Sequence, residues 1–89
     1  MIRWGFQKGA AYFATPAVPG APKRVMLCIG RAGHDVTFSR LGGAFHSERP
    51  DIIEGREVCF IDDADGRYTV SAASVADIEV AANVLQAIG

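Results

Sequence analysis

Four side chains of this 89-residue sequence are of the types that bind metals or act as nucleophiles: Cys28, His34, His46 and Cys59. Their spacings of 6, 12 and 13 residues match no zinc-binding pattern, and each cysteine stands inside an apolar run, VMLCI or VCFI. A cysteine in such a run is usually a small buried core residue. We therefore predict two core cysteines, no metal and no cofactor, and leave open whether Cys28 and Cys59 are paired.

Motifs typical of catalysis or nucleotide binding are missing from the sequence. Ser47 stands in HSER, without the flanking glycines of a Gly-x-Ser-x-Gly nucleophile. The acidic turn DDADG resembles part of a calcium loop, but the EF-hand spacing would put Ile61 and Ala72 at the first and last ligand positions. Neither GxGxxG nor GxxxxGK occurs. We predict that the protein is not an enzyme.

The composition is typical of one soluble domain. The chain is 49% hydrophobic and 21% charged, with nine Lys and Arg against ten Asp and Glu. That apolar share is too high for a disordered tail, and two cysteines are too few for a disulfide scaffold. No apolar run approaches the roughly 18 to 20 residues of a membrane-spanning helix, so we predict no membrane partner.

The net charge of −1 conceals an uneven distribution along the chain. Residues 1–50 carry seven basic and two acidic side chains, whereas residues 51–89 carry two basic and eight acidic ones. If the two halves occupy different parts of the fold, the basic end of one copy can meet the acidic end of another in head-to-tail contacts. If the charges interleave in the folded chain, they cancel locally. The sequence leaves both arrangements open.

We predict an extended, aromatic and Pro-rich arm over residues 1–22. The segment has no acidic residue, no helical periodicity and three of the four prolines, which favour extended backbone and cannot donate to a sheet. Buried aromatic side chains often dominate interfaces, so we expect its aromatic residues to anchor the arm on its own domain or on another chain. These residues are Trp4, Phe6, Tyr12 and Phe13.

Residues 23–89 are predicted as a single domain that contains two β-hairpins. The first joins the apolar run 24–29 to the alternating run 34–41 through a glycine-containing turn. The second joins residues 56–61 to residues 67–72 through the Asp-Gly step of DDADG, which tolerates the left-handed backbone of tight turns. The segment between the hairpins is predicted as a long loop with at most one short strand.

A helix is predicted from Ser74 to the end of the sequence. Ser74 and Asp77 resemble a capping box, and SVADIEVAANVLQAIG has no breaker before its last glycine. Its apolar arc spans roughly 200°, about twice what packing on one sheet requires, and is centred on Val80, Val84 and Ile88. We expect those three residues to contact the arm or another subunit. The predicted fold is α+β: a small antiparallel sheet of about four strands packed by one C-terminal helix, with an extended N-terminal arm.

Two local resemblances bear on function. The run IGRAGHDV resembles the I-G-x-x-G-x-x-I core of KH domains, which implies nucleic-acid binding by the loop 30–33. KH domains place that loop between helices, whereas the flanks VMLCI and VTFS favour strands, so the context disfavours nucleic acid as a partner. The succession GHDVTFSR, EGREVCFI and RYTV, over residues 33–71, is similar to small β-rich head–tail joining and virion proteins of tailed phages. That resemblance implies a ring-forming subunit without catalysis.

The sequence therefore predicts a non-enzymatic assembly protein, a small phage virion component that joins neighbouring subunits and resides in the virion or the host cytoplasm. Its partners would be other copies of the chain or other virion subunits. The alternative is a small phage-encoded inhibitor or regulator that binds a host defence complex through the acidic half of the chain. The acidic residues that would dock on such a partner are Asp51, Glu54, Glu57, Asp62, Asp63 and Asp65.

Overall fold

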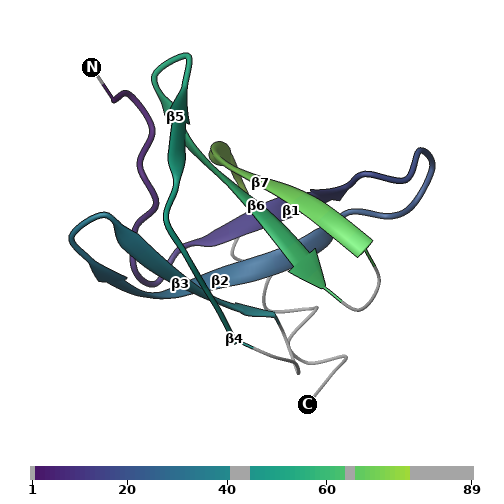
Figure 1. Cartoon of the computed structure of the whole chain (residues 1–89), viewed down its shortest axis with the longest axis horizontal. Helices are drawn as coiled ribbons and strands as arrows, with labels where there is room; N and C mark the ends of the chain where they lie inside the picture. The colour runs from purple at the N-terminus through teal and green to yellow at the C-terminus, as the bar shows by residue number, and fades with distance from the viewer. Residues whose placement is uncertain (1, 41–44, 64–65, 77–89) are drawn as a thin grey trace.

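The computed structural model describes residues 2–40, 45–63 and 66–76, which form one antiparallel sheet of seven strands (Figure 1). The strand order across the sheet is β4-β3-β2-β1-β7-β6-β5. The strands are β1 (Ala11–Pro16), β2 (Arg24–Ala32), β3 (Asp35–Arg40), β4 (Phe45–Glu48), β5 (Asp51–Ile53), β6 (Arg56–Asp63) and β7 (Gly66–Val75).

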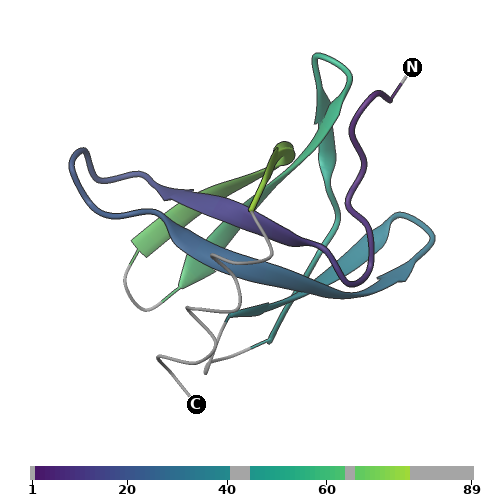
Figure 2. The same ribbon diagram turned by 180° about the vertical axis from the view of Figure 1, so that it is seen from behind.

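The sheet is curled into a half-barrel (Figures 1 and 2). Its two edge strands, β4 and β5, are consecutive in the chain and are linked by Arg49 and Pro50 alone. A flat sheet of seven strands, spaced about 4.8 Å apart, would hold its edges too far apart for a two-residue link. The curl therefore follows from the connectivity, and it encloses one face of the sheet.

The enclosed face carries the hydrophobic core. Successive side chains of a strand point to opposite faces, so the paired residues Tyr12 and Met26 both point inward, while their neighbours point outward. Phe6, which precedes β1, fills the space between Tyr12 and Phe38, and its ring meets each of theirs edge to face with centroids 4.9 Å apart. The other core residues are Ala14, Cys28, Val36, Cys59, Ile61, Tyr68, Val70 and Ala72.

The two predicted hairpins are confirmed by the pairing of β2 with β3 and of β6 with β7. Their turns contain glycines in the left-handed region, with φ of 62° at Gly33 and 120° at Gly66. The segment between the hairpins was predicted as a loop with at most one short strand, yet it forms both β4 and β5. These strands are short and pair with β3 and β6, so local sequence carries little signal for them.

The prediction of an α+β fold with about four strands and a C-terminal helix is wrong, because the described residues form seven strands and no helix. Ser74, the predicted helix cap, lies within β7, and the next residue, Val75, pairs with Tyr12 of β1. Strand pairing with β1 thus overrides a local capping pattern. The remainder of the predicted helix, residues 77–89 with Val80, Val84 and Ile88, lies outside the described residues.

The extended N-terminal arm, part of the same fold prediction, is also corrected. Residues 11–16 form β1, which lies between β2 and β7 in the middle of the sheet. Within AYFATP, Ala11 and Phe13 face outward while Tyr12 and Ala14 face inward, which is the alternation of a strand. Pro16 is the last residue of the strand, where the absence of a main-chain N–H donor costs little. The predicted boundary between residues 22 and 23 falls in the connection from β1 to β2.

Candidate functional site

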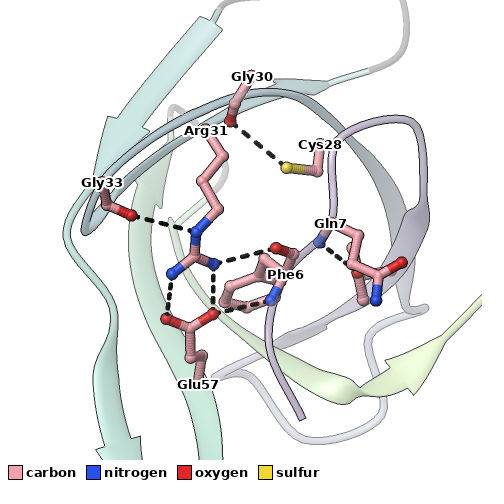
Figure 3. A network of polar contacts seen from close by, with 8 residues as sticks. Phe6, Gln7, Cys28, Gly30, Arg31, Gly33 and Glu57 are labelled. Carbon is pink, nitrogen blue, oxygen red and sulfur yellow. Dashed lines mark hydrogen bonds and ion pairs between the residues drawn. The ribbon is translucent and has the colours of Figure 1, made fainter.

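A partly buried ion pair crosses the open side of the curled sheet. Arg31, in β2, and Glu57, in β6, belong to strands that β1 and β7 separate in the sheet, and the curl brings them together. Two parallel hydrogen bonds join the guanidinium to the carboxylate, from Nη1 to Oε1 at 2.5 Å and from Nη2 to Oε2 at 2.7 Å (Figure 3). The Nε–H of Arg31 donates to the carbonyl of Gly33 at 3.2 Å, which orients the guanidinium.

The main chain of Phe6 completes this network. Its N–H donates to Oε1 of Glu57 at 2.8 Å, and its carbonyl accepts from Nη1 of Arg31 at 3.0 Å (Figure 3). The next N–H, of Gln7, donates to the hydroxyl of Tyr12 at 2.9 Å. Three separate parts of the chain are therefore fastened at one point, which we call the Arg31–Glu57 clasp and which consists of Arg31, Glu57 and the main chain of Phe6.

The electrostatics of the clasp are those of a structural ion pair. The side chain of Glu57 is 5% exposed and that of Arg31 is 29% exposed. The hydrogen bonds from Arg31 hold the pKa of Glu57 below its usual value, which outweighs the opposing effect of burial, and the same contact raises the pKa of Arg31. Because both carboxylate oxygens already accept hydrogen bonds, Glu57 is poorly placed to take a proton from a substrate.

A hollow of about 440 Å³ lies next to the clasp. It is bounded by the β2–β3 turn with His34, by the β4–β5 link, and by the apolar side chains of Ile2 and Ile52. A second hollow, of about 650 Å³, has a polar lining that includes Lys8, Thr37 and Ser47. In it the hydroxyls of Thr37 and Ser47 lie 3.3 Å apart. Cationic and acidic groups border both hollows, so neither favours one sign of ligand charge.

Exposed apolar side chains lie on both faces of the sheet where residues 2–4 meet the β5–β6 hairpin. The turn of this hairpin is tight, with φ of 52° at Glu54 and 80° at Gly55, as a two-residue type I′ connection requires. Arg56 pairs with Ile53 on one side and forms a parallel bridge with Trp4 on the other, so Trp4 and Ile53 flank it on one face. Ile52, the partner of Glu57, points to the opposite face, where it lines the smaller hollow together with Ile2. We name this end of the sheet the β5 corner; its members on the two faces are Ile2, Trp4, Ile52 and Ile53, which are 46%, 50%, 60% and 44% exposed.

The structure separates the four aromatic residues that the sequence singled out as anchors. Trp4 is exposed in the β5 corner, whereas Phe6 and Tyr12 are buried in the core. Phe13 is half-buried on the outer face of the sheet, in a second apolar cluster. The other members of that cluster are Ala11, Val25, Leu27 and Ala76. The three predicted contact residues near the end of the chain lie outside the described part, as noted above.

The residues with metal-binding or nucleophilic side chains do not form a site. Cys28 and Cys59 lie on the core face as free thiols, and burial raises the pKa of both, that of Cys59 to about 12. His34 borders the smaller hollow, while Nε2 of His46 is buried without a hydrogen-bond partner in the described structure. Within the described ranges, no three His, Cys, Asp or Glu side chains converge as metal ligands.

Sequence reasoning missed the two features that dominate this end of the molecule. Arg31 and Glu57 are 26 residues apart, and nothing in either local sequence indicates that they meet. Ile52 and Ile53 had a local signal, because DII stands two residues before the strand that begins at Arg56 and is joined to it by a Glu-Gly step. That pattern is typical of a short hairpin.

No family model, curated protein or solved structure matches this chain. No helix among the described residues has the length and apolar character needed to cross a membrane.

Proposed function

We propose that this protein is a non-enzymatic assembly protein, a small component of a phage particle, whose copies join head to tail through the β5 corner. The observation that carries this proposal is the exposure of four large apolar side chains at one end of a small domain. Exposed apolar side chains favour burial against a partner, at about 25 cal/mol per Å² of apolar surface removed from water. Trp and Ile side chains of this size are suited to anchoring such a contact.

The charge distribution supports a second copy as the partner. Strands β1 to β4 come from the basic half of the chain and β5 to β7 from the acidic half, and the strand order keeps each group contiguous. Strands β1 to β4 carry three basic and two acidic side chains, whereas β5 to β7 carry two basic and four acidic ones, and Asp51 and Glu54 lie beside the β5 corner. Opposite charges on the two sides favour a head-to-tail contact over a symmetric one.

The clasp and the buried thiols support a role without catalysis. Glu57 has a lowered pKa and accepts hydrogen bonds on both carboxylate oxygens, and burial raises the pKa of the Cys59 thiol. Neither group is prepared to act as a base or a nucleophile. Glu57 instead fixes the position of Trp4 and Phe6, because it bonds the main chain of both.

The alternative role, an inhibitor or regulator that docks through its acidic half, has less support. Among the acidic residues predicted to form that docking surface, Glu57 is buried in the clasp and Asp62 is bonded to Arg67 at 2.8 Å. Asp65 lies outside the described residues. Fewer carboxylates are therefore available to a basic partner than the sequence indicates.

Sedimentation velocity and native mass measurement test the assembly role. We expect the wild type to form species heavier than its 9.5 kDa chain, and we expect Ile53→Asp to weaken that association at least about tenfold, because it puts a charge in the apolar contact. The matched control is Val18→Asp, since Val18 is 61% exposed on the β1–β2 connection and outside the β5 corner. A wild type that is monomeric at every concentration, alone and with candidate virion subunits, would overturn the proposal.

The dependence of association on salt concentration distinguishes the two roles. Association that depends on the β5 corner should persist from low to moderate salt, since apolar burial is not screened by ions. Docking by an acidic surface on a basic partner should weaken steeply over the same range. If the wild type is monomeric and its complex with a host protein dissociates steeply as the salt concentration rises, the inhibitor role is favoured.

A further inference from the structure

We infer that the outer face of β5 and β6 is a docking surface for an arginine-bearing, otherwise apolar segment of a partner protein, whose guanidinium binds the carboxylate of Asp51. The inference rests on the proposed assembly role where it uses Trp4 and Ile53 of the β5 corner, and it specifies the chemistry of the group that they meet. It is carried by an exposed carboxylate in the middle of an apolar surface, without an ion pair or hydrogen bond among the described residues.

Val58 lies at the centre of this surface. It points to the outer face, because the next residue, Cys59, points into the core, and yet it is only 5% exposed. Strand pairing places Asp51 of β5 on one side of it and Ser71 of β7 on the other. Side chains of the adjoining strands therefore surround Val58 on the outer face.

Two aromatic side chains mark the ends of the surface. Phe60 follows Val58 by two residues on the same face and is 44% exposed. Trp4, which is 50% exposed, is the bridge partner of Arg56 and points to the same face, and Ile53 lies on the other side of Arg56. Arg56 and Phe60 are about 13 Å apart along the strand, at about 3.3 Å per residue. The surface is therefore long enough for a short extended segment.

The carboxylate of Asp51 determines which partner this surface accepts. Asp51 is exposed and directly opposite Val58, and residues paired in this way have Cβ atoms about 4.5 to 5.5 Å apart. In the part of the chain that the structure describes, its side chain forms no ion pair or hydrogen bond. A partner that covers the apolar side chains also removes this carboxylate from water, which costs free energy unless the partner supplies a cation or another donor.

The arginines that share this face are already paired within the chain. Arg56 donates to Glu54 at 3.2 Å, and Arg67 donates to Asp62 at 2.8 Å. Among the described residues of this face, Asp51 therefore remains as the uncompensated charge. An anionic partner is disfavoured, and a partner that presents one cation among apolar side chains complements the surface.

Arginine suits this surface better than lysine does. Its planar guanidinium donates two parallel hydrogen bonds to a carboxylate and also stacks on aromatic rings, whereas the lysine ammonium is a point charge without a flat face. The methylene groups of an arginine can lie over the apolar side chains beside Val58 while its charge reaches Asp51. The same bidentate contact occurs within this chain, between Arg31 and Glu57.

Titration with two short peptides tests this surface. The probe is acetyl-Ile-Arg-Ile-amide, and its control is acetyl-Ile-citrulline-Ile-amide, which keeps the shape of the arginine side chain without its charge. Trp4 is the single tryptophan of the chain, so its fluorescence reports binding at this surface. Asp51→Asn removes the charge with little change of shape. The matched control is Asp35→Asn, because Asp35 is also exposed at the start of a strand but belongs to β3.

We expect the wild type to bind the arginine peptide at least about fivefold more tightly than the citrulline peptide, as an exposed ion pair reinforced by stacking provides. Asp51→Asn should abolish this preference, and Asp35→Asn should retain it. Equal affinity of the wild type for the two peptides, or a preference that survives Asp51→Asn, overturns the inference. If the wild type sediments as an assembly, the assembly role stands in either case. If the wild type is monomeric but prefers the arginine peptide, the assembly role is overturned and the surface is a site for a different protein.

Discussion

Residues 2–6 contribute to two regions that differ in exposure, the partly buried clasp and the exposed β5 corner. Phe6 is 2% exposed and packs against two aromatic rings, whereas Trp4, two residues earlier, is 50% exposed. The main chain between them is held by hydrogen bonds to Gly55 and Glu57. The size and aromatic character of a side chain therefore do not reveal its role in this segment. The neighbouring strand decides which aromatic side chain stabilises the fold and which remains on the surface.

Phe6→Ala is expected to have the largest effect on stability. The substitution leaves a cavity in the centre of the core, and truncation of a buried phenylalanine costs about 3 to 5 kcal/mol. That is a large part of the total stability of a domain this small. Urea unfolding followed by circular dichroism measures the loss. A loss below about 1 kcal/mol would show that Phe6 does not anchor residues 2–6.

Arg31→Met is expected to have the next largest effect. It leaves the carboxylate of Glu57 buried without its main partner, which costs about 2 to 4 kcal/mol after allowance for the partial exposure of Arg31. The double variant Arg31→Met, Glu57→Leu removes both charges and should recover most of the loss. Urea unfolding of both variants checks this. Equal destabilisation of the single and double variants would contradict the account of the clasp as a coupled pair.

The pH dependence of stability isolates the charge of the clasp from its packing. Arg31 lowers the pKa of Glu57 in the folded chain, relative to an unfolded value of about 4.3. The resulting stabilisation is fully present above the unfolded pKa and is lost as the pH falls through the lower, folded pKa. Between about pH 7 and about pH 3 the wild type should therefore lose more unfolding free energy than the Arg31→Met, Glu57→Leu variant. Parallel losses in the two proteins would assign the acid sensitivity to other carboxylates.

Local pattern sufficed for part of the fold. The β2–β3 and β6–β7 hairpins could be predicted because each combines apolar runs with a glycine next to the turn, Gly33 in one and Gly66 in the other. Both the runs and the glycine lie within a short stretch of sequence. The position of β1 could not, because Ala11–Pro16 becomes a strand only through partners that follow it by at least eight residues in β2 and by more than fifty in β7.

The candidate site depended even more on distant contacts. The uneven distribution of charge along the chain could be read from the sequence. Only the sheet topology shows that the strands of the two halves stay in separate groups. The clasp joins Phe6, Arg31 and Glu57 only because the sheet curls, and the curl follows from the two-residue link between its edges. The capping pattern at Ser74 indicated a helix because it takes no account of the pairing between Val75 and Tyr12.

Trp4→Ala is expected to change stability least and so sharpens the contrast with Phe6→Ala. Half of the Trp4 side chain is already in water, and its main-chain hydrogen bonds do not depend on its side chain, so the unfolding free energy should change by less than about 0.5 kcal/mol. Association should nevertheless weaken at least about tenfold, because an aromatic anchor is removed from the β5 corner. Circular dichroism during urea unfolding gives the first quantity and sedimentation velocity the second. Substantial destabilisation with unchanged association would reverse the roles assigned to Trp4 and Phe6, since Trp4 would then belong to the fold rather than to the contact between copies.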